Sequence, residues 1–553
     1  MYLNNFDNAT IDKAYLTNGI VNNFGNATIG EAHIEDGGTV SFGRGLDGNI
    51  GYVGGQGGTP GNAGAGDNWD KATRKGHDET ISGGRGDDTI ATSAITKAEI
   101  SGILSNGNGG TGGTGGTGGN GGDGGNAGSW FNWIIHAENG KPGGDGGTGS
   151  TGGNGGNGEG NIGIANVNAF GTLNNGQGGD GGKGGTGGNG GKSGNGHQSL
   201  GAYTGGNGGD GGKGGTGGNG GDGTGYIGIA NVYTDGVLSN GKGGSNGFTG
   251  NLGQWGTWGD YSGGWPGDAG GWGQGGEGGT GGYGDGEITT ANILGGTVYN
   301  GHGAKGTGII ITANVGKDDT GKLTGGLLLN AFNGGRGEIT TANLYSGTIE
   351  NAGTIDNMTY YAGTYNNAGN GSLGTLTLAG NSANNTGNWG NVNNLQFASN
   401  GSGYMTISAF ADDSAPGFTS SIKAQNVDLT YGNVALDMSR FSYDDNLVSS
   451  FFAAFDFVDG FNLTDLLGDM FGASNVSGAD GLNSFEVAFG AESFWILNDG
   501  DFTADWSFNN LTGFVTYIDG IDGGNGSSVP EPATLAIIGL GLAGLGLARR
   551  RRK

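Results

Sequence analysis

The feature that most constrains this chain is a set of tracts in which two of every three residues are glycine. Gly109 to Asn126 form six consecutive Gly-Gly-X triplets, and the sequence GGDGGKGGTGGNGG occurs at both Gly178–Gly191 and Gly208–Gly221. Ordering glycine is entropically costly, so an isolated tract is not expected to hold one shape. A three-residue period permits extended helices whose bare backbones can approach and hydrogen-bond. The tracts are therefore expected either to pack as a bundle or to act as disordered linkers.

Composition excludes several classes of protein. Glycine supplies 143 of the 553 residues but proline only 6, which excludes collagen. The chain has no cysteine, so disulfides and thiolate metal sites are absent. Its formal net charge is −27 at pH 7. Because such a surface repels phosphate backbones, we expect no nucleic-acid partner.

The rest of the body repeats as short alternating apolar runs closed by glycine or Asn-Gly. Residues 9–26 align with 27–44, a period of 18 residues, and residues 162–179 match 227–244. Such runs are typical of strands separated by turns, and one period is about the length of a β-helix rung. We therefore predict an all-β fold: a right-handed parallel β-helix, or solenoid, with Gly-Gly-X insertions. Stacked asparagines are expected to form side-chain ladders along it: Asn166, Asn231, Asn292 and Asn343.

The repeats and the changes in composition divide the chain into six parts. Tracts begin directly after the similar sequences LSNGNGG, LNNGQGG and LSNGKGG, so we expect them to be insertions from one corner of the solenoid. The two IGIANV sequences, at Ile162 and Ile227, should then be neighbouring strands. The predicted parts are N-terminal rungs at 1–45, an insert at 46–98, rungs with glycine insertions at 99–286, further rungs at 287–425, a small α+β capping domain at 426–525 and a sorting segment at 526–553.

The C-terminal segment has three parts in order. A Val-Pro-Glu-Pro sequence begins at Val529, an uncharged apolar run extends from Ala533 to Ala548, and four arginines and a lysine end the chain. A helix of this run would be about 24 Å long against a hydrocarbon core of about 30 Å, which predicts one short transmembrane helix. The basic end should lie in the cytoplasm and the body outside it. An ordinary tail anchor is the alternative interpretation.

This ending resembles the PEP-CTERM sorting signal of Gram-negative bacteria. The resemblance implies recognition by an exosortase-type membrane protease, export, initial anchoring of the C-terminus in the inner membrane, and a role at the cell surface or in an exopolysaccharide or biofilm matrix. No signal peptide precedes the body, which predicts a truncated start of the sequence. The residues that match the signal are Val529, Pro530, Glu531, Pro532, Arg549, Arg550, Arg551 and Arg552.

The rungs themselves resemble the passenger regions of bacterial autotransporter adhesins. The sequences that carry this resemblance are IGIANV, EITTAN and GTIDNMTYYAGTYNNAG. The resemblance implies an adhesive role for the body of the chain.

Few residues could carry chemistry. Residues 83–91, GGRGDDTIA, fit the nonapeptide of Ca²⁺-binding β-rolls, in which Asp87 and Asp88 would be ligands. A plain tight turn is the alternative, and we expect no other cofactor. Five aromatic residues concentrate in one glycine-rich segment, where they could stack on sugar rings or form a small core of their own. They are Trp255, Trp258, Tyr261, Trp265 and Trp272.

No catalytic motif accompanies these residues. The five histidines are dispersed, and neither HExxH nor GxSxG occurs. We therefore expect an exported, non-enzymatic surface or matrix protein of structural or adhesive type. The alternative is a β-helical polysaccharide-degrading enzyme. A cluster of carboxylates and basic groups in a groove on one solenoid face would favour that enzyme.

Overall fold

The structure, a computed structural model, consists almost entirely of strands and extended segments. It describes residues 2–42, 91–124, 142–198, 202–411, 416–439 and 461–517, apart from single residues and short gaps inside these ranges. The chain forms two compact, interleaved units. Unit 1 comprises Met1–Ala291, Gly296–Ile310 and Ala331–Gly337, and unit 2 comprises Asn292–Gly295, Ile311–Asn330 and Glu338–Lys553.

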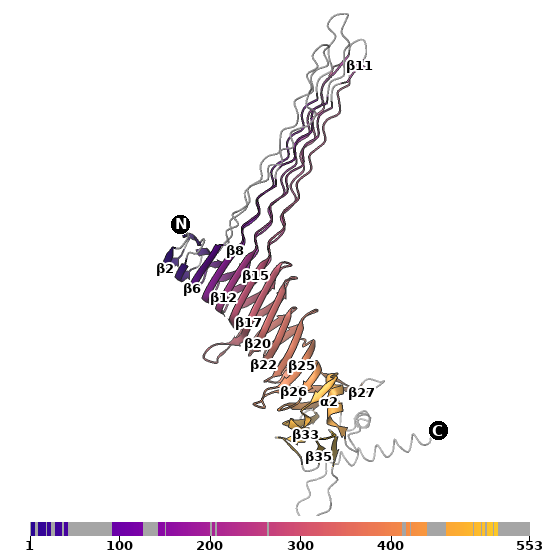
Figure 1. Cartoon of the computed structure of the whole chain (residues 1–553). Helices are drawn as coiled ribbons and strands as arrows, with labels where there is room; N and C mark the ends of the chain where they lie inside the picture. Colours follow the sequence, from indigo (N-terminus) through magenta and orange to yellow (C-terminus); the bar gives the residue numbers. More distant parts are fainter. Residues whose placement is uncertain are drawn as a thin grey trace, which may run out of the picture. The chain divides into compact units, whose positions relative to one another are not determined.

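Unit 1 contains a parallel solenoid made of two strand series that alternate along the chain (Figure 1). The first series is β2 (Thr10–Leu16), β4 (Thr28–Ile34), β6 (Ala91–Ile100), β8 (Gly158–Val167), β12 (Gly223–Tyr233) and β15 (Gly284–Leu294). The second series is β1 (Tyr2–Asn5), β3 (Gly19–Asn23), β5 (Gly38–Phe42), β7 (Ile103–Asn106), β9 (Thr172–Gln177), β13 (Val237–Lys242) and β16 (Thr297–His302). This architecture fits the predicted β-helix, while its handedness stays a prediction.

The register of the first series follows the sequence repeat. Strands β8 and β12 are parallel neighbours with Ile162 opposite Ile227, which confirms that the two IGIANV sequences lie side by side. The buried residues recur as Ile-x-x-Ala-x-Val, so identical apolar side chains stack from rung to rung. Burying one such aliphatic side chain contributes about 1.5–3 kcal/mol. The apolar residues of strands β8 and β12 with no surface accessible to solvent are Ile162, Ala165, Val167, Ile227, Ala230 and Val232.

One strand lies where the sequence predicted an insert. Strand β6 begins at Ala91, inside the range 46–98, and pairs in parallel with both β4 and β8. Its buried Ile95, Ala98 and Ile100 repeat the Ile-x-x-Ala-x-Val pattern with isoleucine in the last place. The rung therefore starts earlier than expected, and its signal was present in the sequence.

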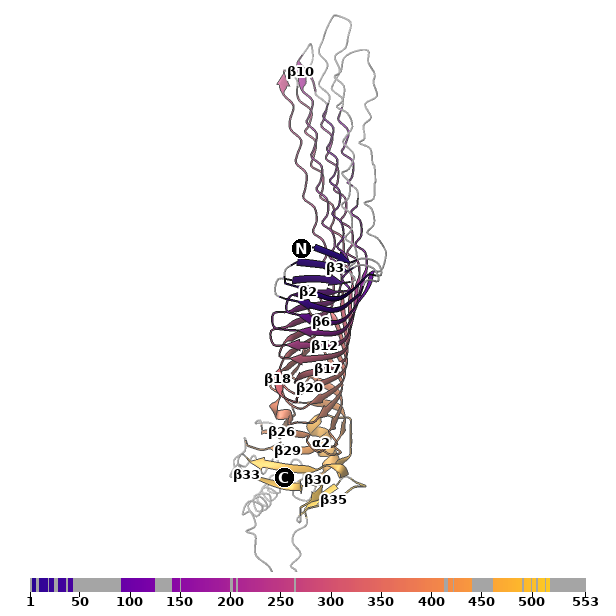
Figure 2. The same cartoon turned by 90° about the vertical axis from the view of Figure 1, so that its left-hand side faces the viewer.

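The glycine-rich insertions form a bundle of extended tracts that leave and re-enter the solenoid strands of unit 1 (Figures 1 and 2). Tracts 1, 3 and 5 run outward, and tracts 2, 4 and 6 return. Their described residues are 107–124, 142–157, 178–195, 207–222, 243–260 and 265–283 for tracts 1 to 6 in order. Three short strands lie toward the far end of the bundle: β10 (Gly196–Gln198), β11 (Ala202–Tyr203) and β14 (Tyr261–Ser262).

Backbone hydrogen bonds join the tracts in a regular lattice. We call the residue after X the first glycine and the next residue the second glycine. The first glycine donates its N–H to an X carbonyl of the neighbouring parallel tract, as Gly112 does to Asp180 at 2.8 Å. The second glycine donates to an antiparallel tract, as Gly113 does to Gly153 at 2.7 Å. The described tracts therefore adopt the bundled arrangement rather than that of a disordered linker.

The second strand series of unit 1 contains a buried asparagine ladder that the sequence analysis did not identify. Asn106 donates to Asn175 at 2.7 Å, Asn175 to Asn240 at 2.8 Å and Asn240 to Asn300 at 2.8 Å. None of these side chains is accessible to solvent. Each one precedes a glycine with positive φ, between 62° and 72°, where the chain turns out of the rung. The recurring Asn-Gly after each strand was the available signal.

Unit 2 continues the same style of rung. It contains most of β17 (Gly306–Lys317), with the antiparallel strand β18 (Leu323–Gly325). Parallel strands of the first series follow: β20 (Arg336–Leu344), β22 (Thr354–Tyr360), β24 (Ser372–Leu378), β25 (Asn391–Phe397), β28 (Lys423–Asp428) and β31 (Asn475–Ser477). Those of the second series are β19 (Leu327–Phe332), β21 (Thr348–Asn351) and β23 (Thr364–Asn367).

One mixed sheet, one antiparallel sheet and one described helix end unit 2. The helix, α2 (Leu463–Phe471), begins at the side-chain cap Asn462 and ends at the left-handed Gly472. One sheet contains β26 (Tyr404–Ala411), β27 (Pro416–Ser420), β29 (Asn433–Asp437), β32 (Ser484–Phe489), β33 (Glu492–Asn498) and β34 (Asp501–Phe502). Another contains β30 (Phe461–Asn462), β35 (Trp506–Asn509) and β36 (Phe514–Tyr517). Two 3₁₀ turns, Ser382–Asn384 and Ala479–Gly481, complete the elements described here.

Among the described residues, no helix has both the length and the apolar character needed to cross a membrane. The apolar run 533–548 lies outside those residues. Its prediction as a short transmembrane helix therefore stays a prediction.

Candidate binding edge of the glycine bundle

Tract 5 keeps the three-residue period but has only one glycine in each triplet. The glycine that it keeps is the second one, which donates to tract 6, as Gly253 does to Gly273 at 2.9 Å. In tract 3 the first glycine donates to tract 5, as Gly181 does to Ser245 at 2.8 Å. In tract 5 that position holds a side chain instead. The residues concerned are Asn246, Thr249, Leu252, Trp255 and Trp258.

These side chains mark the end of the lattice. Inside the bundle the first-glycine position has no room for a side chain, because a Cβ atom on Gly184 would lie 1.9 Å from the carbonyl oxygen of Gly276. Beyond tract 5 the described part of the chain supplies no further parallel tract. The residues at this position are accordingly exposed. We call the surface formed by Leu252, Trp255, Trp258 and Trp272 the outer edge.

Large apolar side chains dominate the outer edge. The exposed fraction is 55% for Leu252, 60% for Trp255, 63% for Trp258 and 46% for Trp272. The rings of Trp255 and Trp272 meet edge to face with centroids 4.9 Å apart, so tracts 5 and 6 contribute to one surface. Successive triplets of such an extended helix repeat about every 9 Å. The edge therefore presents large apolar groups at a regular spacing along a line.

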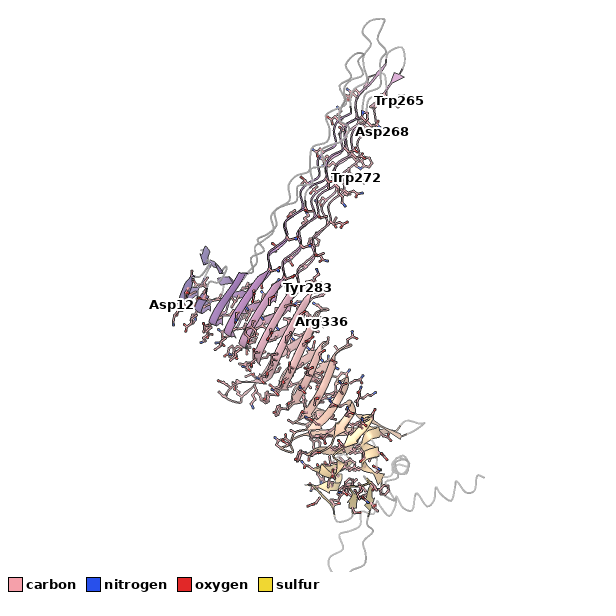
Figure 3. All side chains as sticks on the ribbon, in the orientation of Figure 1. Asp12, Trp265, Asp268, Trp272, Tyr283 and Arg336 are labelled. Carbon is pink, nitrogen blue, oxygen red and sulfur yellow. The ribbon has the colours of Figure 1, made fainter. Side chains whose placement is uncertain are left out.

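Two further exposed aromatic residues of tract 6 lie at X positions, away from the outer edge. Figure 3 shows Trp265, Asp268 and Trp272 along the tract, with Tyr283 at its base. Trp265 and Tyr283 are 66% and 58% exposed. The Nζ atom of Lys305 lies 5.4 Å from the centre of the Tyr283 ring, a cation–π contact.

The charge of this segment has a single sign. Residues 243–283 include Asp260, Asp268 and Glu277 but no lysine or arginine. All three carboxylates are exposed. Lys183, Lys192 and Lys213 are exposed on the adjoining tracts 3 and 4, but carboxylates outnumber them six to three over tracts 3 to 6, so the surroundings of the outer edge supply hydrogen-bond acceptors and repel anions.

Asparagine and aspartate at X positions have a structural role that the sequence analysis missed. The three-residue period alone predicts that X residues such as Thr111, Asn120, Asp123, Asp180 and Lys183 line outer edges as a regular array of small polar groups. In the structure many Asn and Asp side chains at these positions accept a hydrogen bond from a backbone N–H group of the next parallel tract. For example, Ser245 donates its backbone N–H to Asp180 Oδ1 at 2.8 Å, and Gln254 donates to Asn189 Oδ1 at 2.8 Å. The matching X residues in successive tracts were the available signal.

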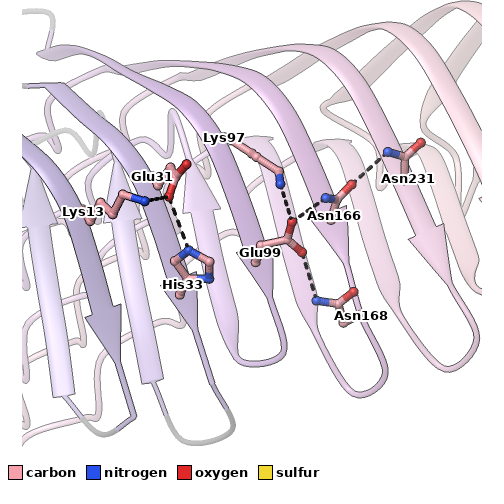
Figure 4. Close-up of polar contacts among 8 residues, drawn as sticks. All are labelled: Lys13, Glu31, His33, Lys97, Glu99, Asn166, Asn168 and Asn231. Carbon is pink, nitrogen blue, oxygen red and sulfur yellow. Dashed lines mark hydrogen bonds and ion pairs between the residues drawn. The ribbon is translucent and has the colours of Figure 1, made fainter.

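A second polar cluster lies on the first strand series of the solenoid (Figure 4). Lys13 Nζ lies 2.8 Å from Glu31 Oε2, and Lys97 Nζ lies 3.0 Å from Glu99 Oε1. Asn166 donates to Glu99 at 2.7 Å and accepts from Asn231 at 2.8 Å, which confirms part of the predicted asparagine ladder. The Lys13–Glu31, Asn166–Glu99 and Asn231–Asn166 contacts join successive rungs, whereas Lys97 and Glu99 lie in the same strand, β6.

The pKa directions in this cluster favour ion pairs. The hydrogen bond from Lys13 lowers the pKa of Glu31, and the same bond raises the pKa of Lys13. Burial acts to raise the pKa of Glu99, but hydrogen bonds from Asn166 and Lys97 outweigh it and leave the pKa below its ordinary value. Both carboxylates therefore stay charged near neutral pH. A general acid would need the opposite shift.

Several predicted site residues cannot be placed. Asp87 and Asp88 of the possible Ca²⁺ site lie outside the described residues, as do Val529–Pro532 and Arg549–Arg552 of the sorting motif. Tyr261 lies in β14, but its side chain is not among those described. Within the described residues, no group of three or more His, Asp or Glu side chains could hold a metal ion.

Comparison with known proteins identifies one segment of the chain. Residues 528–553 match the PEP-CTERM protein-sorting motif, which confirms the resemblance seen at the C-terminus. This motif indicates an exported protein that an exosortase processes and that reaches the cell envelope or surface of a Gram-negative bacterium. No curated protein matches the chain.

Proposed function

We propose that this chain is a non-enzymatic structural or adhesive protein of the cell surface or extracellular matrix, associated there with exopolysaccharide. The observation that carries the proposal is the outer edge. It places four large apolar side chains in solvent on a backbone that is hydrogen-bonded on its inner sides. Exposed apolar groups of this density typically mark an interaction surface. The export signal places that surface outside the cytoplasm.

The bundle suits such a role because it holds the edge rigidly. Each triplet of tract 5 donates one backbone hydrogen bond to tract 6 and accepts one from tract 3, and side chains at X positions of tract 3 add further ones. Little backbone freedom therefore remains to be lost when a partner binds. Pre-organisation of this kind raises affinity by lowering the entropic cost of binding.

The Lys13–Glu31 and Lys97–Glu99 pairs bear on the enzymatic alternative. They do bring carboxylates and basic groups onto one solenoid face, which is the arrangement that would favour a polysaccharide-degrading enzyme. However, each charge is neutralised by its partner, and the pKa values of Glu31 and Glu99 shift away from the range of a general acid. This pattern supports a structural role for the cluster.

The proposal is tested in an exosortase-containing Gram-negative host that makes the full chain, against the same host without it. We expect the protein in the cell-surface or matrix fraction, increased cell attachment, and no release of reducing sugar from the matrix. A double Trp255→Ala, Trp258→Ala variant should be exported normally but bind the matrix more weakly. Unchanged attachment with all of the protein free in the medium would contradict the proposal, and sugar release would favour the enzyme.

A further inference from the structure

We propose that the outer edge binds one extended chain of a neutral, β-linked polysaccharide, which lies along tract 5 where the next tract of the lattice would be. This inference rests on the proposed surface or matrix role and names the class of polymer. It combines the spacing of the edge, its unused backbone donors, its charge and the size of its side chains.

The spacing of the edge suits a linear polymer with a short repeat. Leu252, Trp255 and Trp258 occupy the same position in consecutive triplets, so they recur about every 9 Å along a line. That distance is comparable to the length of a disaccharide. Flat indole rings can stack on the apolar faces of pyranose rings, and Trp272 packs edge to face against Trp255 and supports that ring from the side. A straight, extended glycan would contact the side chains of successive triplets, whereas a coiled glycan would contact only one of them.

The edge also carries a row of backbone donors. In tract 3 the N–H of Gly181 donates to the next tract from the first-glycine position. Leu252, Trp255 and Trp258 hold the same lattice position in tract 5, and the described residues offer their N–H groups no acceptor. A polymer in place of the missing tract would supply acceptors through its hydroxyl and ring oxygens. The N–H groups face the position of the next parallel tract, and the side chains face the open position of the next antiparallel tract beside it, so a periodic polar chain with apolar faces can contact both.

Charge selects a neutral polymer. Asp260, Asp268 and Glu277 are exposed on tracts 5 and 6, and residues 243–283 contain no basic residue. A polyuronate or sulfated glycan would be repelled there, and the net charge of −27 adds to this effect. Sugar hydroxyls can instead donate hydrogen bonds to these carboxylates.

A second copy of the chain fits the edge poorly. Packing of glycine tracts requires bare backbone, since a Cβ atom on Gly184 would lie 1.9 Å from a neighbouring carbonyl oxygen. The indole rings of Trp255 and Trp258 keep another tract beyond that distance. A glycan needs no such approach, because its hydroxyl groups extend toward the protein.

The test is affinity electrophoresis of the purified full-length chain through gels that contain hydroxyethylcellulose, dextran or alginate. These are a neutral extended β-glucan, a neutral flexible α-glucan and an anionic polyuronate. We expect retardation by hydroxyethylcellulose alone. Trp255→Ala and Trp258→Ala should each raise the dissociation constant for hydroxyethylcellulose roughly tenfold. Tyr233→Ala, which removes an exposed ring from β12 on the solenoid, is the matched control and should change nothing.

A composition-preserving variant tests the spacing. Exchanging two neighbours, Thr257→Trp with Trp258→Thr, moves one indole from the edge to the X face and should weaken binding as much as Trp258→Ala does. Hydrogen exchange of the tract amides verifies that each variant keeps the bundle. The inference would be overturned if alginate retarded the chain as much as hydroxyethylcellulose does, or if the Trp variants bound as well as the unsubstituted chain. It would also be overturned if the chain bound no glycan but self-associated, and the same variants abolished that self-association. The proposed surface role would still stand if the chain remained in the matrix fraction.

Discussion

At the scale of single residues, the buried asparagines of unit 1 show how one side chain per rung controls register. Asn175 and Asn240 each accept from one neighbouring amide and donate to the next, so a shift of one rung by a residue would leave buried polar groups unpaired. The ladder stops at Asn106, whose Oδ1 is buried without a hydrogen-bond partner. The strand residue opposite it is Phe42, and phenylalanine has no side-chain donor.

Asn175 is the residue in which a substitution should be most damaging. Replacement by alanine leaves the Nδ2 group of Asn106 and the Oδ1 atom of Asn240 without their ladder partner in a fully buried site. We expect Asn175→Ala to lower the free energy of unfolding by about 3 kcal/mol. Urea denaturation followed by circular dichroism measures this change. Asn174→Ala, on the same strand but partly exposed, should cost under about 0.5 kcal/mol; equal losses would show that the ladder has no special role.

At the scale of elements, the rungs were predictable because their information is local. The Ile-x-x-Ala-x-Val pattern of β8 recurs in β12. Stacking of identical apolar side chains in neighbouring strands then determines the register. The early start of β6 was missed because its serine, lysine and glutamate residues obscure the same apolar spacing. The buried ladder was missed because Asn-Gly usually marks a turn, and here it marks a turn as well as a core position.

The order of the glycine tracts could not be decided from local sequence. The acceptors of Gly112 and Gly113 lie in tracts 3 and 2, far along the chain, and nothing in a single Gly-Gly-X run specifies them. The outer edge was partly foreseen, since Trp255, Trp258, Trp265 and Trp272 were singled out as aromatic groups for stacking. Their common position was not. Tract 5 has a glycine at every third residue, and Leu252, Trp255 and Trp258 each directly precede one of these glycines. This spacing was the available signal that the three side chains share one edge.

Removing bare backbone from the lattice should disrupt the bundle. Cβ atoms on Gly112, Gly115 and Gly118 would lie 1.9, 2.0 and 2.1 Å from carbonyl oxygens of tract 4. We expect the triple alanine variant to lose amide protection throughout tract 1, since overpacking at each site costs about 1–3 kcal/mol. Hydrogen exchange measured by mass spectrometry is the readout. Thr114→Ala, on the exposed X face, should keep full protection, whereas unprotected exchange in the unsubstituted chain would rule out the ordered array.

At the scale of the whole molecule, function is divided between the body and the C-terminal segment. The body supplies surfaces, whereas residues 528–553 carry the sorting information. This information was readable from sequence because it depends on order and charge rather than on tertiary contacts. The resemblance of the body to autotransporter adhesins stays a prediction, and the outer edge became visible only when the tracts lay side by side.

The basic end of the sorting segment gives the prediction that belongs to this scale. Arg549–Arg552 should hold the C-terminus in the cytoplasm, because moving four positive charges across the inner membrane is unfavourable. Replacing all four by glutamine should leave an uncleaved, misoriented precursor in place of the exported mature protein. Immunoblotting of cell fractions measures the size and location of the product. Replacement by lysine keeps the charge, so it should restore orientation, and any remaining defect in cleavage would then report on recognition of arginine by the protease. Mature protein of unchanged size from the glutamine variant would show that the charge of this segment has no part in sorting.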